Sequence, residues 1–205
     1  MLKELIIKNF TNKVFDLPLF YAFQDGIRFE LSDEASPIKQ FLTAFETSKP
    51  IIQKIINGND NALICLRSRL EFPIFKNRQT IRSLYDAGVK FGRDRELWVE
   101  EITDPDLLDD ENKGFWIYIA FNVKINFIEN FIWCALSNDL GVIKPAPGVM
   151  VYIFNIKEKI AAFPYDARGM DVIGYNHLFL KSLYNQFKNN TFQYDEEKMR
   201  LAFKD

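Results

Sequence analysis

The sequence predicts a single α+β domain over residues 1–205, with a mixed but mainly antiparallel sheet and helices packed largely on one face. Three observations support this prediction. Apolar segments with the spacing of strands alternate with segments of helical spacing. No internal repeat, low-complexity tract or Gly/Ser linker divides the chain. The composition, 48% hydrophobic and 26% charged, is typical of a chain that folds around a core.

The first predicted elements are a strand and a long helix. Residues 26–31 alternate between apolar and polar side chains, which predicts a half-buried strand with Arg28 and Glu30 on its polar face. A Ser-Pro pair then opens a helix over residues 36–56, and Pro50 is expected to kink or restart it because proline has no amide hydrogen to donate. The side chains expected to face the core in its first half are Ile38, Phe41, Leu42 and Phe45.

The middle of the chain combines short elements with two blocks of charge. We predict strands at residues 62–66, 97–102 and 116–123 and a helix at 80–89. Residues 96–111 contain eight Asp or Glu and no Lys or Arg, whereas residues 67–95 contain eight basic and three acidic side chains. We interpret these blocks as solvated faces that partly complement each other, in preference to an acid-mimic surface beside an anion site.

The C-terminal half begins with the most regular helical pattern of the chain, over residues 128–136. The elements predicted after it are a strand at 149–155, strands at 159–165 and 170–175, and helices at 180–187 and 196–203. The last two strands form a hairpin around residues 166–169. Its spacing suits a type I turn closed by Gly169 in a left-handed conformation.

The charge and composition exclude several classes of function. The net charge of −2 and the pI near 5.6 provide no positive field for nucleic acid, so nucleic-acid binding through the basic block ranks last. No segment reaches the roughly 18 apolar residues of a membrane span, so we expect no membrane association. The aromatic residues, 15% of the chain, are interpreted as core rather than as a stacking platform.

Few residues are available for metal, cofactor or nucleophilic chemistry. Cys65 and Cys134 lie on separate apolar segments, which favours buried reduced thiols and a cytoplasmic location. His177 is the only histidine, and we expect it to cap a helix rather than to act in catalysis. No glycine-rich nucleotide motif and no spacing of metal ligands occurs, so the sequence predicts no metal and no cofactor.

The hairpin turn carries the most suggestive group of polar residues. In a structural interpretation, Asp166 accepts backbone amide hydrogen bonds within the turn and Arg168 clamps the carboxylates. In a functional interpretation, Arg168 binds an anion while Asp166 or Asp171 orients it or acts as an acid or base. The structural interpretation is favoured.

A cleft would form where this turn adjoins the polar face of the strand at residues 26–31. Tyr21 or Tyr165 would then lie at its edge. The candidate cleft residues are Arg28, Glu30, Tyr165, Asp166, Arg168 and Asp171.

Several segments together resemble an uncharacterised bacterial family, described as domain of unknown function 3885. The segments that carry the resemblance are Leu19–Tyr21, 26–31, Asn138–Asp139, Pro147, Val151–Asn155 and 165–172. The resemblance covers most of the chain and is densest from Ile125 to Phe203. It implies a bacterial protein with this α+β layout and implies no activity, cofactor or catalytic residue. The family pattern leads us to expect an acidic residue where Ala167 stands.

Two hypotheses of function follow. The first is a non-enzymatic binding or interaction module, of an immunity or antitoxin type, that binds another protein through exposed aromatic or acidic side chains. The second is a hydrolase or transferase in which Arg168 holds a small anionic substrate and Asp166, Asp171 or Glu30 exchanges protons. The first is favoured because the sequence contains no catalytic motif.

Overall fold

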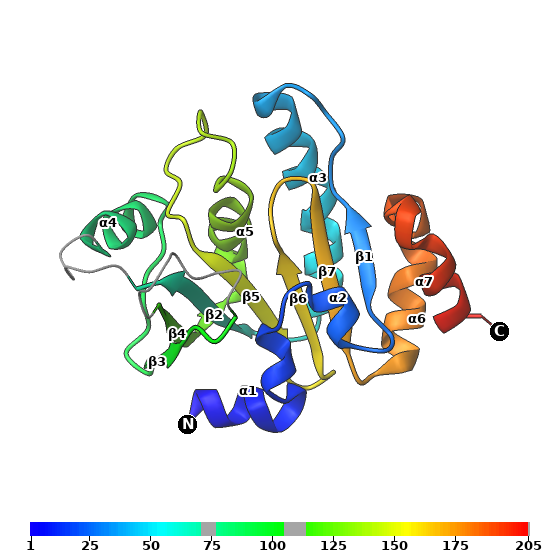
Figure 1. Ribbon diagram of the computed structural model, residues 1–205, viewed down its shortest axis with the longest axis horizontal. Coiled ribbons are helices and arrows are strands. Elements are labelled where there is room, and N and C mark those ends of the chain that lie inside the picture. Colours follow the sequence, from blue (N-terminus) through cyan, green and yellow to red (C-terminus); the bar gives the residue numbers. More distant parts are fainter. Residues whose placement is uncertain (71–76, 105–113, 205) are drawn as a thin grey trace.

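The computed structural model describes residues 1–70, 77–104 and 114–204 and contains one seven-stranded sheet (Figure 1). The strand order is β1-β7-β6-β5-β2-β4-β3, and every neighbouring pair among the described residues is antiparallel. The α+β class is therefore confirmed. The strands are β1 (Ile27–Glu30), β2 (Asn61–Arg69), β3 (Glu96–Glu101), β4 (Phe115–Lys124), β5 (Met150–Asn155), β6 (Ile160–Pro164) and β7 (Gly169–Gly174).

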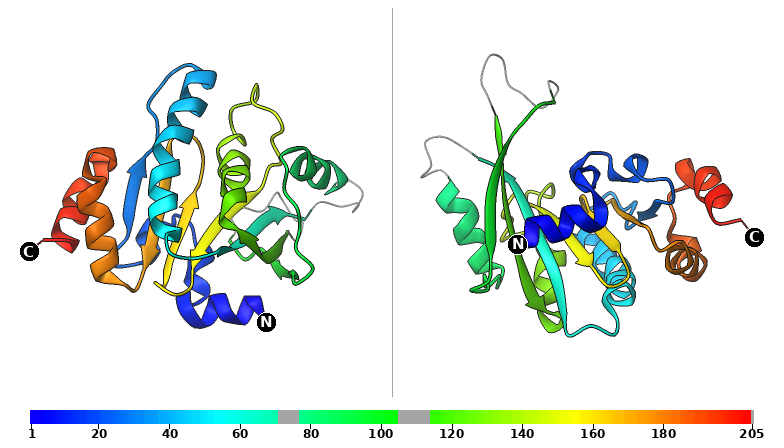
Figure 2. Two further views of the ribbon diagram at one scale, coloured as in Figure 1. Left: turned by 180° about the vertical axis from the view of Figure 1, so that it is seen from behind. Right: turned by 90° about the horizontal axis from the view of Figure 1, so that it is seen from below.

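The helices are divided unequally between the two faces of this sheet. The α-helices are α1 (Leu2–Phe10), α2 (Leu19–Ala22), α3 (Pro37–Ile56), α4 (Arg78–Asp86), α5 (Ile128–Leu136), α6 (His177–Gln186) and α7 (Glu196–Ala202). The long helix α3 packs with α5 on one face, whereas α1 and the 3-10 helix η1 (Asn12–Phe15) lie on the other (Figure 2). Helices α6 and α7 lie beside β1 (Figure 1).

Each central strand is buried on both faces, which explains its nearly continuous apolar sequence. In β5, Val151 and Ile153 join the core beneath α3 and α5, while Tyr152 and Phe154 join the core beneath α1 and η1. Successive side chains of a strand point to opposite faces, so one strand serves both cores. The second core is rich in aromatic rings, in agreement with the interpretation of the aromatic composition.

The outer edge of β1 is covered by the C-terminal segment. The backbone amide of Phe192 donates to the carbonyl of Arg28 at 3.0 Å, and the Arg28 amide donates to the Met199 sulfur at 3.3 Å. Phe29 also forms an isolated bridge with Thr191. These contacts occupy the backbone groups of an edge strand, which would otherwise offer a template for pairing with another chain.

The N-terminal segment contains helices that the sequence analysis does not predict. Only Ile6 and Phe10 of α1 are buried, and charged side chains interrupt the pattern, so the periodic signal is too short to detect. The helix α2 spans a single turn and is held by tertiary contacts rather than by helix propensity.

The helix α3 is confirmed, but its buried stripe differs from the prediction. Ile38 and Leu42 are 59% and 54% exposed, whereas Ala44 and Ser48 are fully buried. The stripe therefore includes small side chains, which a search for large apolar residues does not detect. The helix also continues through Pro50 as one element rather than restarting there.

The two cysteines are buried, and the histidine lies at the start of α6. Cys65 and Cys134 are free and buried, as expected for reduced thiols, and burial raises the pKa of the Cys134 thiol to about 12. The prediction that His177 caps a helix is wrong, because the Asn176 side chain caps α6 by accepting a hydrogen bond from the Phe179 amide. His177 is the first residue of the helix, and its Nδ1 lies 2.9 Å from Asp25.

We predict that Pro50→Ala increases the free energy of unfolding by about 1 to 2 kcal/mol, because alanine restores an amide donor inside α3 at an exposed position. Thermal denaturation should show a rise of about 2–4 °C per kcal/mol in the midpoint for a chain of this size. The control is Pro37→Ala at the first turn, where proline is tolerated and the change should be small. A lower midpoint for Pro50→Ala would contradict the prediction.

Candidate functional site

The pairing of β1 with β7 brings the two parts of the predicted cleft together. Arg28 lies directly opposite Asp171, and Asp171 lies opposite Phe163 of β6. Because side chains alternate along a strand, these three residues share one face of the sheet. That face is the one covered by the N-terminal segment, since Phe163 packs there with Leu19 at the start of α2.

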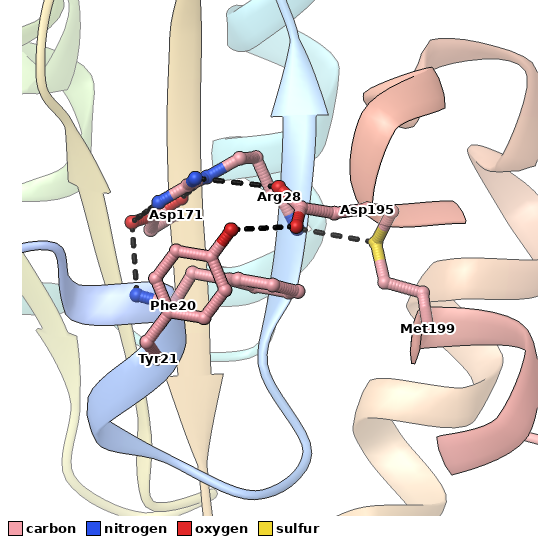
Figure 3. Close-up of polar contacts among 6 residues, drawn as sticks. All are labelled: Phe20, Tyr21, Arg28, Asp171, Asp195 and Met199. Carbon is pink, nitrogen blue, oxygen red and sulfur yellow. Dashed lines mark hydrogen bonds and ion pairs between the residues drawn. The ribbon is translucent and has the colours of Figure 1, made fainter. Parts of the chain in front are cut away.

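Arg28 and Asp171 form a two-point ion pair (Figure 3). Nε and Nη2 of Arg28 donate to the two carboxylate oxygens of Asp171 at 2.8 and 3.0 Å. The backbone amide of Phe20 donates to the same carboxylate at 2.9 Å. The ion pair therefore fixes α2 to the sheet as well as joining two strands.

Asp195 provides a second carboxylate on the other side of Arg28. Nη1 of Arg28 lies 3.3 Å from Asp195, whose other oxygen accepts a hydrogen bond of 2.8 Å from the Tyr21 hydroxyl. The ammonium group of Lys198 lies over the rings of Phe20 and Tyr21, at 4.4 and 4.6 Å from their centroids. We call Arg28, Asp171, Asp195, Phe20 and Tyr21 the Arg28 cluster.

The charged side chains of the Arg28 cluster are shielded from water, whereas the Tyr21 side chain is 50% exposed. The side chains of Arg28, Asp171 and Asp195 are only 14%, 1% and 6% exposed. Burial acts to lower the pKa of Arg28, but the hydrogen bond and charge of Asp171 outweigh burial and raise it. The hydrogen bond to Asp195 raises the pKa of Tyr21, so this hydroxyl stays a donor.

The hairpin turn has the structural role that the sequence analysis favours. Asp166 accepts a hydrogen bond of 2.7 Å from the Arg168 backbone amide and one of 2.9 Å from Nε of the same residue. The Arg168 side chain is 69% exposed. Ala167, where an acidic residue was expected, is 2% exposed and packs in the core beneath α3 and α5. A carboxylate at this position would be buried.

Gly169 has a different role from the one predicted. It lacks the positive φ expected of a left-handed turn residue. Instead, a Cβ placed on Gly169 would overlap the hydroxyl and ring of Tyr165. The absence of a side chain thus leaves room for the Tyr165 ring against the start of β7. Tyr165 makes no hydrogen bond through its hydroxyl with the described residues, and burial followed by the charge of Asp171 raises its pKa.

A pocket of about 450 Å³ opens over this part of the sheet. Its polar lining consists of Arg28, Tyr165, Arg168 and Asp171. Its six apolar lining residues are Leu17, Pro18, Leu19, Met150, Phe163 and Phe192. We call this space the β7 pocket.

The family comparison agrees with the resemblance seen in the sequence. The model for Domain of unknown function (DUF3885) matches residues 2–195. The chain belongs to the DUF3885 family. No curated protein and no solved structure shows significant similarity to it.

In this DUF3885 protein, most of the predicted cleft residues meet in one place. Arg28, Tyr165, Arg168 and Asp171 line the same pocket, whereas Asp166 lies beside it as the partner of Arg168. Glu30 makes no hydrogen bond or ion pair with any of them among the described residues. It lies opposite Gly169 and is no part of the Arg28 cluster.

Sequence reasoning missed Asp195 and the backbone amide of Phe20. Asp195 lies 167 residues from Arg28 in the chain, so no local pattern links the two. One signal existed, because Asp195 directly precedes a predicted helix, where an acidic side chain is common. That signal predicts a cap, however, and not an ion pair.

Neither a cluster of metal ligands nor a membrane-spanning helix occurs among the described residues. They contain no group of three His, Cys, Asp or Glu side chains placed to hold a metal ion. No helix within the described ranges is long and apolar enough to cross a membrane.

We predict that Arg28→Met lowers the free energy of unfolding by about 3–5 kcal/mol, because it leaves buried Asp171 and Asp195 without a counter-charge. Chemical denaturation at neutral pH measures the loss.

The matched control is Arg82→Met, which removes an exposed arginine from its ion pair with Asp86, a side chain that is also exposed. It should change stability by about 1 kcal/mol or less. Equal losses for the two variants would refute the assignment of the Arg28 cluster as a buried structural clamp.

We predict that Gly169→Ala destabilises the protein by about 1–3 kcal/mol through overlap with Tyr165. Gly92→Ala is the control, because the nearest atom to its Cβ, the Asn122 carbonyl oxygen, lies at 3.6 Å. A double-mutant cycle with Tyr165→Ala should show coupling between positions 165 and 169. Additive effects in that cycle would contradict the packing role of Gly169.

Proposed function

We propose that this protein is a binding module without catalytic activity of its own, and that its β7 pocket receives an apolar side chain of a protein partner beside a carboxylate. One observation carries the proposal. The charged groups at the base of the pocket are already bonded to one another, whereas its walls are apolar.

The apolar walls favour binding of an apolar group. Leu17, Pro18, Met150 and Phe192 lie around the pocket rather than in the closed core, and burial of apolar surface is the main source of affinity in such sites. A volume of about 450 Å³ accommodates a large side chain with part of its backbone.

Two donors at the pocket favour an acceptor next to that apolar group. The Tyr165 hydroxyl has no hydrogen-bond partner among the described residues, and its raised pKa keeps it protonated. Arg168 uses Nε and Nη2 for Asp166, while its Nη1 makes no hydrogen bond with the described residues. An exposed arginine beside a tyrosine is a common anchor of protein interfaces.

A hydrolase or transferase is the alternative, favoured by the presence of Arg28, Arg168 and Asp171 around one pocket. Against it, two of the three candidate carboxylates are already bonded to a guanidinium and a backbone amide: Asp171 to the side chain of Arg28 and the amide of Phe20, and Asp166 to the side chain and the amide of Arg168. The third candidate, Glu30, does not line the pocket. A general acid or base needs a position within reach of a substrate proton and a pKa near the working pH. Because the hydrogen bonds of Asp166 and Asp171 are already formed within the protein, these carboxylates fit structural roles better than acid–base roles.

Selection of peptides from a phage-displayed library on the immobilised protein tests the proposal. We expect enrichment of peptides with a large apolar residue next to Asp, Glu or a free C-terminal carboxylate. Arg168→Met should weaken their binding at least about tenfold, because a hydrogen bond to a charged group contributes about 1.5–3 kcal/mol. Met150→Glu should weaken it further by placing a like charge in the pocket.

The control variant is Tyr85→Ala, an exposed aromatic on α4 that lies outside the pocket lining. Its binding should equal that of wild type. Peptides without this consensus, or a consensus whose affinity survives both pocket variants, would remove the proposal. Turnover of ester or phosphate substrates that Asp171→Asn abolishes would favour the enzyme instead.

A further inference from the structure

A smaller pocket, of about 230 Å³, lies where β4 extends beyond the start of β3. Its apolar lining includes Val123, Phe127 and Phe131. Its polar side chains belong to Lys90, Asn122 and Lys124. We call it the Asn122 pocket. It shares no lining residue with the β7 pocket, and the function proposed above does not use it.

Asn122 has backbone groups that no neighbouring strand uses. In an antiparallel sheet the N–H and C=O of one residue point to the same neighbour, and the direction alternates along the strand. The Ile102 amide donates to the carbonyl of Gly114, so even-numbered residues of β4 face β3. Strand β3 begins at Glu96, opposite Ala120. Beyond that point, the N–H and C=O of Asn122 make no backbone hydrogen bond on this side with the described chain.

The segment before β3 passes this edge without pairing to it. A Cβ placed on Gly92 would lie 3.6 Å from the Asn122 carbonyl oxygen, so the two segments are close. The Gly92 carbonyl accepts a hydrogen bond of 3.2 Å from Nη1 of Arg95, and the Gly88 carbonyl accepts one of 3.0 Å from the Asn130 side chain. Both glycines line the pocket, so this wall is fixed by bonds that do not involve β4.

Two lysines without counter-ions flank the pocket. Lys90 and Lys124 are exposed, and neither makes a hydrogen bond or ion pair with residues 1–70, 77–104 or 114–204. None of the lining residues that the structure describes is acidic. Glu129, close in sequence to Phe127, is already paired with Lys49 at 2.7 Å. The charge of the lining is therefore positive, which favours an anion.

The segments outside the described ranges join the chain at the other end of β4. Arg69, which precedes the first of them, lies opposite Trp116, and the second ends just before Gly114. Asn122 lies far along β4 from Phe115, about 23 Å for an extended strand of that length. The Asn122 pocket is thus remote from both points of attachment.

The chemistry of the lining limits which anion fits. The cations and the Asn122 N–H suit a carboxylate, which accepts several hydrogen bonds. The apolar side chains suit a hydrocarbon group, whereas a second charged group would lose its water against them without gaining a partner. The volume lies below the range of about 300–1,000 Å³ for sites of drug-sized ligands, so the ligand is small.

We propose that the Asn122 pocket binds a small apolar monocarboxylate, of branched-chain or aromatic type. The carboxylate accepts from the free amide of Asn122 and from the ammonium groups of Lys90 and Lys124. The hydrocarbon part packs against Phe127 and Phe131. The lysine side chains have long flexible stems, which allow both ammonium groups to reach one carboxylate.

The test is isothermal titration of the full chain with 3-methylbutanoate and with phenylacetate. We expect at least one of these acids to bind. Its primary amide, which lacks the charge, and acetate, which lacks the apolar group, should each bind at least about tenfold more weakly. Phe127→Ala should also weaken binding of the acid, because it removes part of the apolar lining.

The decisive variant is the double substitution Lys90→Met/Lys124→Met, which should weaken binding of the acid at least about tenfold. Neither lysine is bonded within the described chain, so the variant should fold, and chemical denaturation checks this. The matched control is Lys8→Met/Lys39→Met, which removes the same charge from two exposed positions outside the pocket lining. It should bind like wild type.

Four results would overturn the proposal. They are failure of both acids to bind, equal affinity for the amide, equal affinity of the folded double lysine variant and wild type, and tighter binding of inorganic phosphate than of either acid. The last would identify a simple anion site. Tighter binding of a dipeptide with a free C-terminus would also overturn it, by assigning the free edge to a peptide.

The outcome is separable from that of the β7 pocket. Loss of acid binding in Arg168→Met, with binding retained in the double lysine variant, would place the acid in the β7 pocket and overturn the proposal. Failure of the selected peptides to bind the β7 pocket leaves the Asn122 pocket unaffected, because the two share no residue.

Discussion

The guanidinium of Arg28 is the point on which this side of the molecule depends. It joins β1 to β7 through Asp171, holds α2 through the amide that shares this carboxylate, and holds the segment before α7 through Asp195. Such a buried ion pair adds little net stability over apolar packing, yet removing one partner is costly. Its contribution here is to fix the positions of these segments, because the hydrogen bonds among the five groups of the Arg28 cluster form together only in this arrangement.

Three arginines on one face of the sheet show how the state of a side chain separates structure from binding. Arg28 is buried and bonded to two carboxylates, Arg168 is exposed and bonded to one, and Arg67 is buried and bonded to the Phe15 carbonyl and the Tyr152 hydroxyl. Residue type alone does not distinguish them. Leu17 lines both the β7 pocket and a second pocket that contains Arg67, so the short connection between η1 and α2 lies between these two pockets.

Local sequence patterns were sufficient to predict most of the strands and long helices. The alternation around Arg28 and the turn after β6 located both halves of the cleft, because side-chain direction in a strand follows directly from position. Local patterns do not predict contacts between segments that lie far apart in the sequence. The contact of Asp195 with Arg28 depends on tertiary packing, and Gly169 was assigned a backbone role because the sequence does not show that Tyr165 approaches it.

The first strand of the sheet pairs with the last, and this order affects synthesis of the protein. While the ribosome extends the chain, β1 has neither its neighbour β7 nor the segment that covers its outer edge. The nascent chain therefore exposes an unpaired strand and an unneutralised arginine until residues as far as Asp195 have emerged. Chaperone binding during translation should concentrate on this interval, because an open strand edge is where aggregation begins.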